Sequence, residues 1–268
     1  MLRKCAEIWD KVRLKTPLVH CMTNYVTIND VANIILASGA SPAMVENPQE
    51  AGDFARISSA LYLNLGTLTG EQELAMVEAV KGAAVAGVPV IVDPVACGVI
   101  PRKVEMLKRF IENGKIACIK GNSAEIKSLA GVQAQARGAD SLDQGEGLEL
   151  ACQALAEKEQ AVVAGTGAVD VVADCQRLAF INNGTFLFSS ITGAGCMVGG
   201  VVAACIGVVP LEPWLATITG LIAFNIAGEQ AARESGANPG SFRSLLFDKL
   251  YHLRGEDIIK EAQVEWRI

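Results

Sequence analysis

Short runs of apolar residues alternate along the chain with longer segments in which apolar positions recur at helical spacing. Four of the runs are typical of buried strands and lie at 61–65, 88–93, 116–119 and 161–164. The longer segments predict helices at about 70–87, 101–113, 122–130 and 147–158. This alternation predicts an α/β fold in which a central, mostly parallel sheet carries helices on both faces.

The pattern changes after residue 161. Three short apolar runs separated by turns follow, namely VDVVAD, LAFI and FLFSS. They predict strands that form an antiparallel edge of the sheet. Two or three long helices then complete the chain. No internal repeat, low-complexity tract or clear linker interrupts residues 1–268, so a single domain is predicted.

Composition restricts the class of protein further. Hydrophobic residues make up 51% of the chain and charged residues 19%, which suits a large folded core. The net charge of −6 argues against a protein that wraps nucleic acid, because such proteins present a basic surface. It does not exclude a nucleotide, whose phosphates can be bound by local loops.

Neither export nor insertion into a membrane is expected. The opening MLRKCAEIWDKVR lacks the apolar core of a signal peptide. The apolar segments 195–209 and 214–228 are shorter than the roughly 20 residues that span a bilayer, which favours two buried helices over a membrane hairpin. The eight cysteines include no CxxC pair, which favours reduced thiols in a cytoplasmic protein over disulfides or a zinc site.

Polar side chains follow the ends of several predicted strands. Asn64 ends the strand in LNLGT, and Asp93 ends the strand in VIVDPVACG. Lys120 and Glu125 follow the next strand in IACIKGNSAE, and Thr166 follows another in VVAGTGAVD. Ligands of open α/β sheets bind at the carboxyl ends of the strands, so one shared cleft is expected. A pair of carboxylates there suits Mg²⁺, which takes one or two carboxylates together with phosphate oxygens.

Each of these motifs also has a purely structural interpretation. Asn122 and Glu125 have the spacing of a capping box that starts a helix. Asp93 belongs to an Asp-Pro pair, which is common in turns. The segment HCMTNYVTINDVANIILASGASPAM offers Asn24 and Met44 to a small heteroaromatic substrate, but by itself it favours an ordinary helix with its stop signals.

The segment SSITGAGCMVGG, 189–200, places a Gly-x-Gly turn before a helix of small apolar residues. Gly193 and Gly195 permit close approach of a ligand, and the free N–H groups of the helix start favour an anion. The segment therefore suits a transferring phosphoryl group. The alternative is a glycine-rich turn capped by Thr192 before a tightly packed helix. Further along the chain, NPGSF predicts a helix whose N-cap is Ser241.

The order and spacing of these motifs over more than 200 residues are more specific than any one of them. The motifs occur in the order VHCMTNYVTINDVANIILASGASPAM, LNLGTL, GVPVIVDPVACG, IKGNSAEI, GTGAVDVV, ITGAGCM and NPGSF. With this order the chain resembles hydroxyethylthiazole kinase, a thiamine-salvage family of the ribokinase-like superfamily. The resemblance implies a ribokinase-like fold and ATP- and Mg²⁺-dependent phosphorylation of the hydroxyl of 4-methyl-5-(2-hydroxyethyl)thiazole. It also implies a homotrimer with active sites at the subunit interfaces.

The resemblance further assigns roles to individual residues. The thiazole substrate is assigned to Met44, Gly193 and Asn24. ATP is assigned to Lys120, Thr166, Gly195 and Ala194. Magnesium is assigned to Asp93 and Glu125. Relatives often carry arginine where this chain has Lys120, and lysine keeps the positive charge but loses the two-pronged guanidinium geometry.

Cys196 follows the Gly-Ala-Gly turn, where ribokinase relatives carry the aspartate that receives the alcohol proton. A thiol at a helix N-terminus is expected to have a lowered pKa, which makes Cys196 the candidate catalytic residue. Its contribution is expected to be modest, because phosphoryl transfer depends mainly on positioning and charge neutralisation. A packing residue at the helix start is the alternative.

Two further functions compete with the thiazole kinase. A related kinase that acts on a hydroxymethylpyrimidine or a sugar alcohol is disfavoured by the GASPAM segment and by Cys196. A non-catalytic thiazole-binding protein is disfavoured by the complete set of Asp93, Lys120 and Glu125 together with TGAGC.

Overall fold

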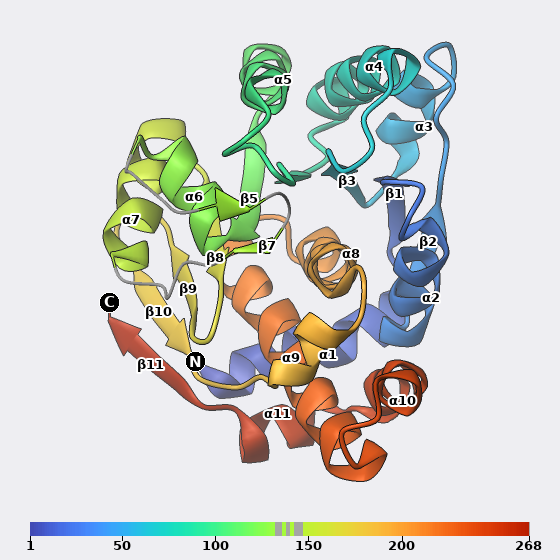
Figure 1. The fold of residues 1–268 in the computed structure, drawn as a ribbon. Helices are drawn as coiled ribbons and strands as arrows, with labels where there is room; N and C mark the ends of the chain where they lie inside the picture. The colour runs from blue at the N-terminus through green and yellow to red at the C-terminus, as the bar shows by residue number, and fades with distance from the viewer. Residues whose placement is uncertain (132–135, 138–139, 142–146, 268) are drawn as a thin grey trace.

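The structure is a computed structural model and describes residues 1–131, 136–137, 140–141 and 147–267. Within them, one sheet has the strand order β11-β10-β9-β8-β5-β4-β3-β1-β2 (Figure 1). Its parallel part consists of β1 (Leu18–Met22), β2 (Ser41–Ala43), β3 (Ala60–Asn64), β4 (Val90–Asp93), β5 (Ile116–Asn122) and β8 (Val162–Thr166). Its antiparallel edge consists of β9 (Asp170–Ala173), β10 (Leu178–Ile181) and β11 (Val264–Arg267). A separate pair is formed by β6 (Ala136–Arg137) and β7 (Asp140–Ser141).

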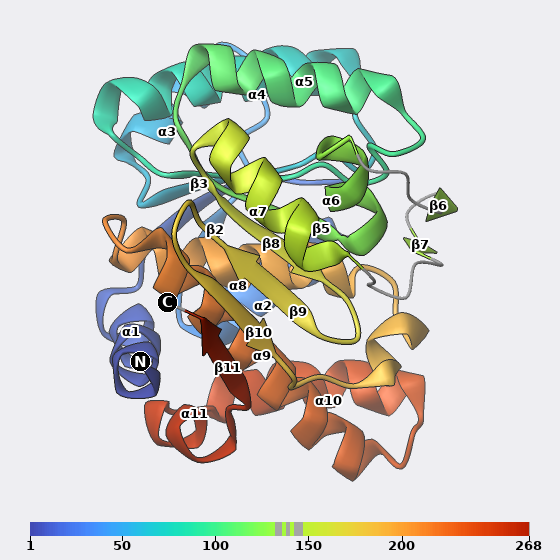
Figure 2. The ribbon, with the colours of Figure 1, turned by 90° about the vertical axis from the view of Figure 1, so that its left-hand side faces the viewer.

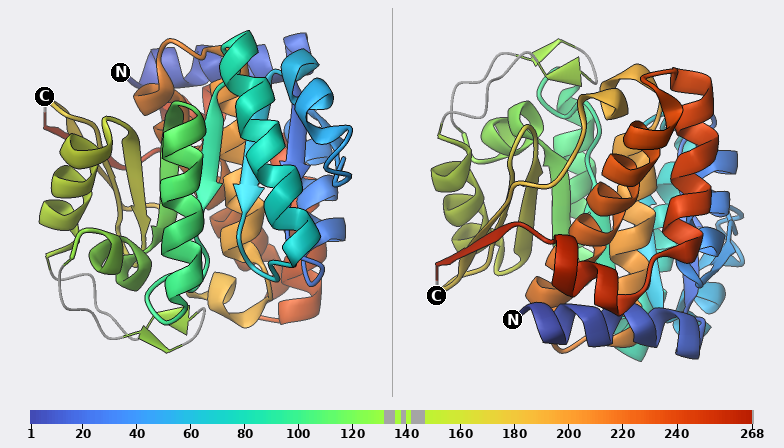
Figure 3. Two further views of the ribbon diagram at one scale, coloured as in Figure 1. Left: turned by 90° about the horizontal axis from the view of Figure 1, so that it is seen from above. Right: turned by 90° about the horizontal axis from the view of Figure 1, so that it is seen from below.

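Helices cover both faces of the sheet (Figures 2 and 3). On one face lie α3 (Ala51–Ile57), α4 (Gly70–Ala86), α5 (Pro101–Asn113), α6 (Ser123–Leu129) and α7 (Leu148–Glu159). On the other face lie α1 (Leu2–Lys15), α2 (Ile28–Ser38), α8 (Ala194–Val208), α9 (Pro213–Ser235), α10 (Pro239–His252) and α11 (Gly255–Glu261). Each face buries its own apolar core, so the predicted α/β architecture with an antiparallel edge is confirmed.

The apolar helices α8 and α9 pack against each other and against the sheet, and most of their side chains are buried. Burial on several sides explains why neither helix shows a polar stripe. No helix in the described ranges combines the length and apolar character that crossing a membrane requires.

Three local predictions are wrong. FLFSS forms a 3₁₀ helix, η1 (Phe186–Ser190), in which Thr185 accepts an N–H from Leu187 and the Phe186 side chain is exposed, so it does not extend the sheet. Helix α10 begins at Pro239, because Pro suits the first helical position, and its N-cap is Asn238. The predicted N-cap Ser241 therefore lies inside the helix. Helix α8 is preceded by Gly193 as its N-cap, not by Thr192.

The parallel strands bring their carboxyl ends to one edge of the sheet. Asn64 at the end of β3 pairs with Asp93 at the end of β4. Asn122 at the end of β5 pairs in the same way with Thr166 at the end of β8. Side chains that are far apart in the sequence therefore share one rim, as the strand pattern predicts.

Candidate active site

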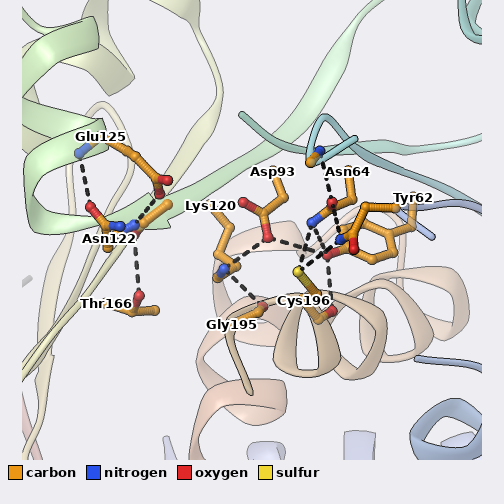
Figure 4. Close-up of polar contacts among 12 residues, drawn as sticks. Tyr62, Asn64, Asp93, Lys120, Asn122, Glu125, Thr166, Gly195 and Cys196 are labelled. Carbon is orange, nitrogen blue, oxygen red and sulfur yellow. Dashed lines mark hydrogen bonds and ion pairs between the residues drawn. The ribbon is translucent and has the colours of Figure 1, made fainter. Parts of the chain in front are cut away.

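A buried ion pair joins the ends of β4 and β5. Lys120 Nζ lies 3.0 Å from Asp93 Oδ2, and both residues are 2% exposed. The same ammonium donates to the Gly195 carbonyl at 2.9 Å, in the first turn of α8 (Figure 4). Burial lowers the pKa of Lys120, but Asp93 and Glu125 outweigh this effect and the pKa lies above its usual value. A permanent positive charge therefore lies beside the glycine-rich turn.

The turn itself requires glycine at position 193. Gly193 has a φ of 84°, and a Cβ there would lie 2.4 Å from Cγ2 of Thr27. Ala194 begins α8, and the exposed Gly195 follows it. The first N–H groups of a helix have no intrahelical acceptor, so this end of α8 can bind an anion next to Lys120.

Cys196 presents its sulfur to two amide side chains. Asn24 Nδ2 and Asn64 Nδ2 each lie 3.3 Å from the sulfur, and Asn24 Nδ2 also donates to Asn64 Oδ1 at 2.9 Å. Burial, followed by the charge of Asp93, raises the pKa of Cys196 above its usual value. The expected lowering by the helix N-terminus is therefore wrong, because desolvation and a neighbouring carboxylate outweigh the effect of the helix. Cys196 is a neutral thiol at neutral pH.

Glu125 forms the predicted capping box. Its Oε2 accepts the Asn122 N–H at 2.7 Å, and Asn122 Oδ1 accepts the Glu125 N–H at 3.0 Å. Its Oε1 accepts the Ala96 N–H at 2.6 Å, in the turn that follows β4. Burial, followed by the charge of Asp93, raises the pKa of Glu125. The structural interpretation is thus confirmed, and the carboxylate also lies within the electrostatic reach of Asp93.

Two predicted residues lie at other points of the same rim. Thr166 Oγ1 donates to the Gly121 carbonyl at 3.3 Å, beside the Asn122–Glu125 pair (Figure 4). Met44 follows β2, the edge strand that lies two strands from β3, and is half-buried against the core that contains α2 and α8.

Sequence reasoning missed two residues that hold the site together. Tyr62 donates its hydroxyl to the Cys196 carbonyl at 2.9 Å and lies 3.2 Å from Asp93 Oδ2. Lys103, 4% exposed, donates to the carbonyls of Gly66 at 2.9 Å and Val95 at 2.6 Å, and burial lowers its pKa. In LYLNL, the polar hydroxyl of Tyr62 within an apolar strand is a signal that the sequence offers. Nothing in IPRKVEML distinguishes Lys103 from an ordinary surface lysine.

The fold defines the class of the protein. A ribokinase-like superfamily protein from Enterococcus faecalis V583 superposes with a TM-score of 0.65 at 9% identity, covering 91% of this chain and 93% of that chain. At this identity the likeness shows the fold alone, and the fold is ribokinase-like.

The chain belongs to the hydroxyethylthiazole kinase family, which it matches over residues 9–256. The hydroxyethylthiazole kinase of Syntrophomonas wolfei subsp. wolfei is 63% identical over 266 residues, which cover 99% of this chain and 100% of the relative. The structure of a hydroxyethylthiazole kinase protein from Pyrococcus horikoshii OT3 superposes with a TM-score of 0.89 at 34% identity, covering 99% of each chain.

Proposed function

We propose that this protein transfers the γ-phosphoryl group of ATP to the hydroxyl of 4-methyl-5-(2-hydroxyethyl)thiazole, a step of thiamine salvage. Membership of the hydroxyethylthiazole kinase family supports the reaction. The observation that carries the proposal is the buried Asp93–Lys120 ion pair. Lys120 also donates to the Gly195 carbonyl, which connects the ion pair to the first turn of α8, next to Cys196.

This arrangement can stabilise a transferring phosphoryl group without covalent chemistry. Lys120 and the N–H groups at the start of α8 place positive charge and dipoles where phosphoryl oxygens gain negative charge. Cys196, fixed by Asn24 and Asn64, lies beside this charge as a neutral thiol. We propose that it contacts the reacting alcohol and contributes modestly, with Met44 and Gly193 at the thiazole and Thr166, Ala194 and Gly195 at ATP.

The carboxylates fit a magnesium ion that arrives with ATP. The described residues contain no group of three or more His, Cys, Asp or Glu side chains able to hold a metal. Mg²⁺ bound to a nucleotide needs only one or two carboxylates, because phosphate and water oxygens complete its shell. Asp93 and Glu125 would hold it, and the ion would neutralise charge on the phosphate oxygens. Two buried carboxylates within electrostatic reach of each other are the chemistry such a cation requires.

We also propose a homotrimer that works in the cytoplasm. Exposed Tyr25 and Val26 follow Asn24 directly, so apolar surface adjoins the site, as an interface at the active site requires. All eight cysteines lie in the described ranges and are free, which suits a reducing compartment. Sedimentation equilibrium tests the trimer: a mass near three times 28.2 kDa supports it, and a monomer contradicts it.

Substrate comparison separates the proposal from its alternatives. Turnover should be fastest with hydroxyethylthiazole and much slower with hydroxymethylpyrimidine or sugar alcohols, with the phosphorylated product identified by mass. A preference for one of the other alcohols would favour the related kinase. Thiazole binding without product would favour a binding protein.

A further inference from the structure

Tyr62 lies within β3, and its side chain is fully buried beneath α8. Its hydroxyl lies 2.9 Å from the Cys196 carbonyl and 3.2 Å from Asp93 Oδ2, and it accepts an N–H from Asn64 at 3.3 Å (Figure 4). A phenol has one proton, so it can donate to only one of the two oxygens at a time. This one hydroxyl therefore contacts the carboxylate of the ion pair, the first turn of α8 and an amide that holds the Cys196 sulfur.

The helix above leaves space for this hydroxyl. A Cβ at Gly199, one turn after Cys196 in α8, would lie 2.3 Å from Tyr62 Oη and 2.5 Å from Cζ, which no real contact allows. Phenylalanine would fill the same ring volume without a polar atom to desolvate. Burying a hydroxyl costs free energy unless it is hydrogen-bonded, so apolar packing does not account for the oxygen.

The contacts on Asp93 explain what the oxygen does. Lys120 Nζ donates to Oδ2 of Asp93. The Tyr62 hydroxyl lies within hydrogen-bond distance of the same oxygen and shares its one proton between that oxygen and the Cys196 carbonyl. Contacts from both neighbouring strands therefore restrict the rotation of the carboxylate. A tyrosine phenol is ordinarily protonated at neutral pH, so the hydroxyl has a proton to donate. A neutral donor at this point does not compete with Lys120 for the negative charge.

We infer that Tyr62 is a positioning residue for phosphoryl transfer, whose hydroxyl fixes the Asp93 carboxylate relative to the first turn of α8. Through the Cys196 carbonyl it holds the thiol and the N–H groups of α8 at a constant distance from the Asp93–Lys120 pair. The inference rests on the proposed function, because it assigns Tyr62 a role in that same reaction.

Replacing the hydroxyl alone tests the inference. Tyr62→Phe should fold with a modest loss of melting temperature, because buried hydrogen bonds are removed. It should lower kcat about tenfold, with both KM values within about twofold, because geometry and not binding is lost. A residue that only packs would leave kcat unchanged. Wild-type kcat in a folded Tyr62→Phe variant would overturn the inference.

A hydroxyl placed on α8, on the opposite side of the same space, should restore part of the lost kcat. Tyr62→Leu empties the space below α8, and Gly199→Ser then places a hydroxyl there from the helix. Tyr62→Leu/Gly199→Ser should turn over several-fold faster than Tyr62→Leu/Gly199→Ala, which differs from it by one oxygen atom. Equal kcat values for two folded double variants would overturn the inference.

A measurement without turnover keeps the inference separate from the proposed function. In a double-mutant cycle of Tyr62→Phe and Asp93→Asn, the losses in thermal stability should be non-additive, because both changes remove one shared contact. Additive losses would show that the hydroxyl does not hold Asp93 and would overturn the inference. If the wild type fails to phosphorylate the thiazole alcohol, the proposed function fails, while this cycle still decides whether the Tyr62 hydroxyl holds the Asp93 carboxylate.

Discussion

At the scale of single residues, the sulfur of Cys196 is held as a hydrogen-bond acceptor. Two side-chain amides donate to it, and burial together with Asp93 raises its pKa. A strong general base would need the opposite environment, with a pKa near the working pH. The structure therefore agrees with a reaction in which positioning and charge neutralisation dominate and proton abstraction contributes little.

Substitution of Cys196 tests this account. Cys196→Asp should retain or raise kcat, since a carboxylate at this position can accept the alcohol proton where the neutral thiol does so weakly. Cys196→Ala should lower kcat by only about tenfold, less than the 10²–10⁴-fold typical of a general base. The exposed Cys175, changed to serine, is the matched control and should behave like the wild type. Complete inactivity of a folded Cys196→Asp variant would contradict a base-like position.

At the scale of secondary-structure elements, the layer above β3 depends on close contact between α3 and α4. A Cβ at Gly82 in α4 would lie 2.0 Å from the Gly52 carbonyl oxygen in α3. Backbone cannot move aside as a flexible side chain can. Alanine at this position must therefore separate the two helices.

Gly82→Ala should destabilise the protein by about 1–3 kcal/mol, the usual cost of overpacking. Gly70 begins the same helix and has no atom within 4 Å of an added Cβ, so Gly70→Ala is the matched control. Chemical denaturation of both variants measures the difference. Equal free energies of unfolding for the two would show that the α3–α4 contact is not tight.

A second link between elements joins β9 to α9. Asp170 Oδ2 accepts the side-chain amide of Asn225 at 2.8 Å, and Oδ1 accepts the Gly167 N–H at 3.0 Å. Burial raises the pKa of Asp170 to about 6, against the opposing effects of these bonds and of Lys120. An exposed aspartate has a pKa of about 3.9. The folded state therefore binds this proton more tightly than the unfolded state does.

The sign of the pH dependence follows from this difference. The stabilising effect of the bound proton is complete below pH about 4 and is lost as pH rises through 6. The free energy of unfolding falls by a total on the order of 3 kcal/mol over this range. Asp170→Asn does not titrate, so wild-type stability should fall relative to this variant between pH 4 and pH 7. Urea unfolding across this range measures it. Parallel stability curves for the two proteins would contradict the shifted pKa.

At the scale of the whole molecule, periodicity predicts the fold well because each strand and helix buries a face of its own. It fails at FLFSS, where local bonds of Thr185 and an exposed Phe186 select a 3₁₀ turn. The positions of Asp93 and Lys120 at the ends of neighbouring predicted strands indicate that the two residues meet, because the ends of parallel strands lie at one rim of the sheet. The ion pair between them confirms this. The contacts of Tyr62 and Lys103 and the raised pKa of Cys196 each involve at least one neighbour more than 30 residues away, which no local pattern records.

The most direct test of the account is ADP formation by the purified protein with ATP, Mg²⁺ and hydroxyethylthiazole, with controls that omit each component. The account predicts turnover that requires all three components and yields one ADP for each thiazole phosphate. ADP formation that is indifferent to the thiazole, or none from folded protein with all three present, would contradict it.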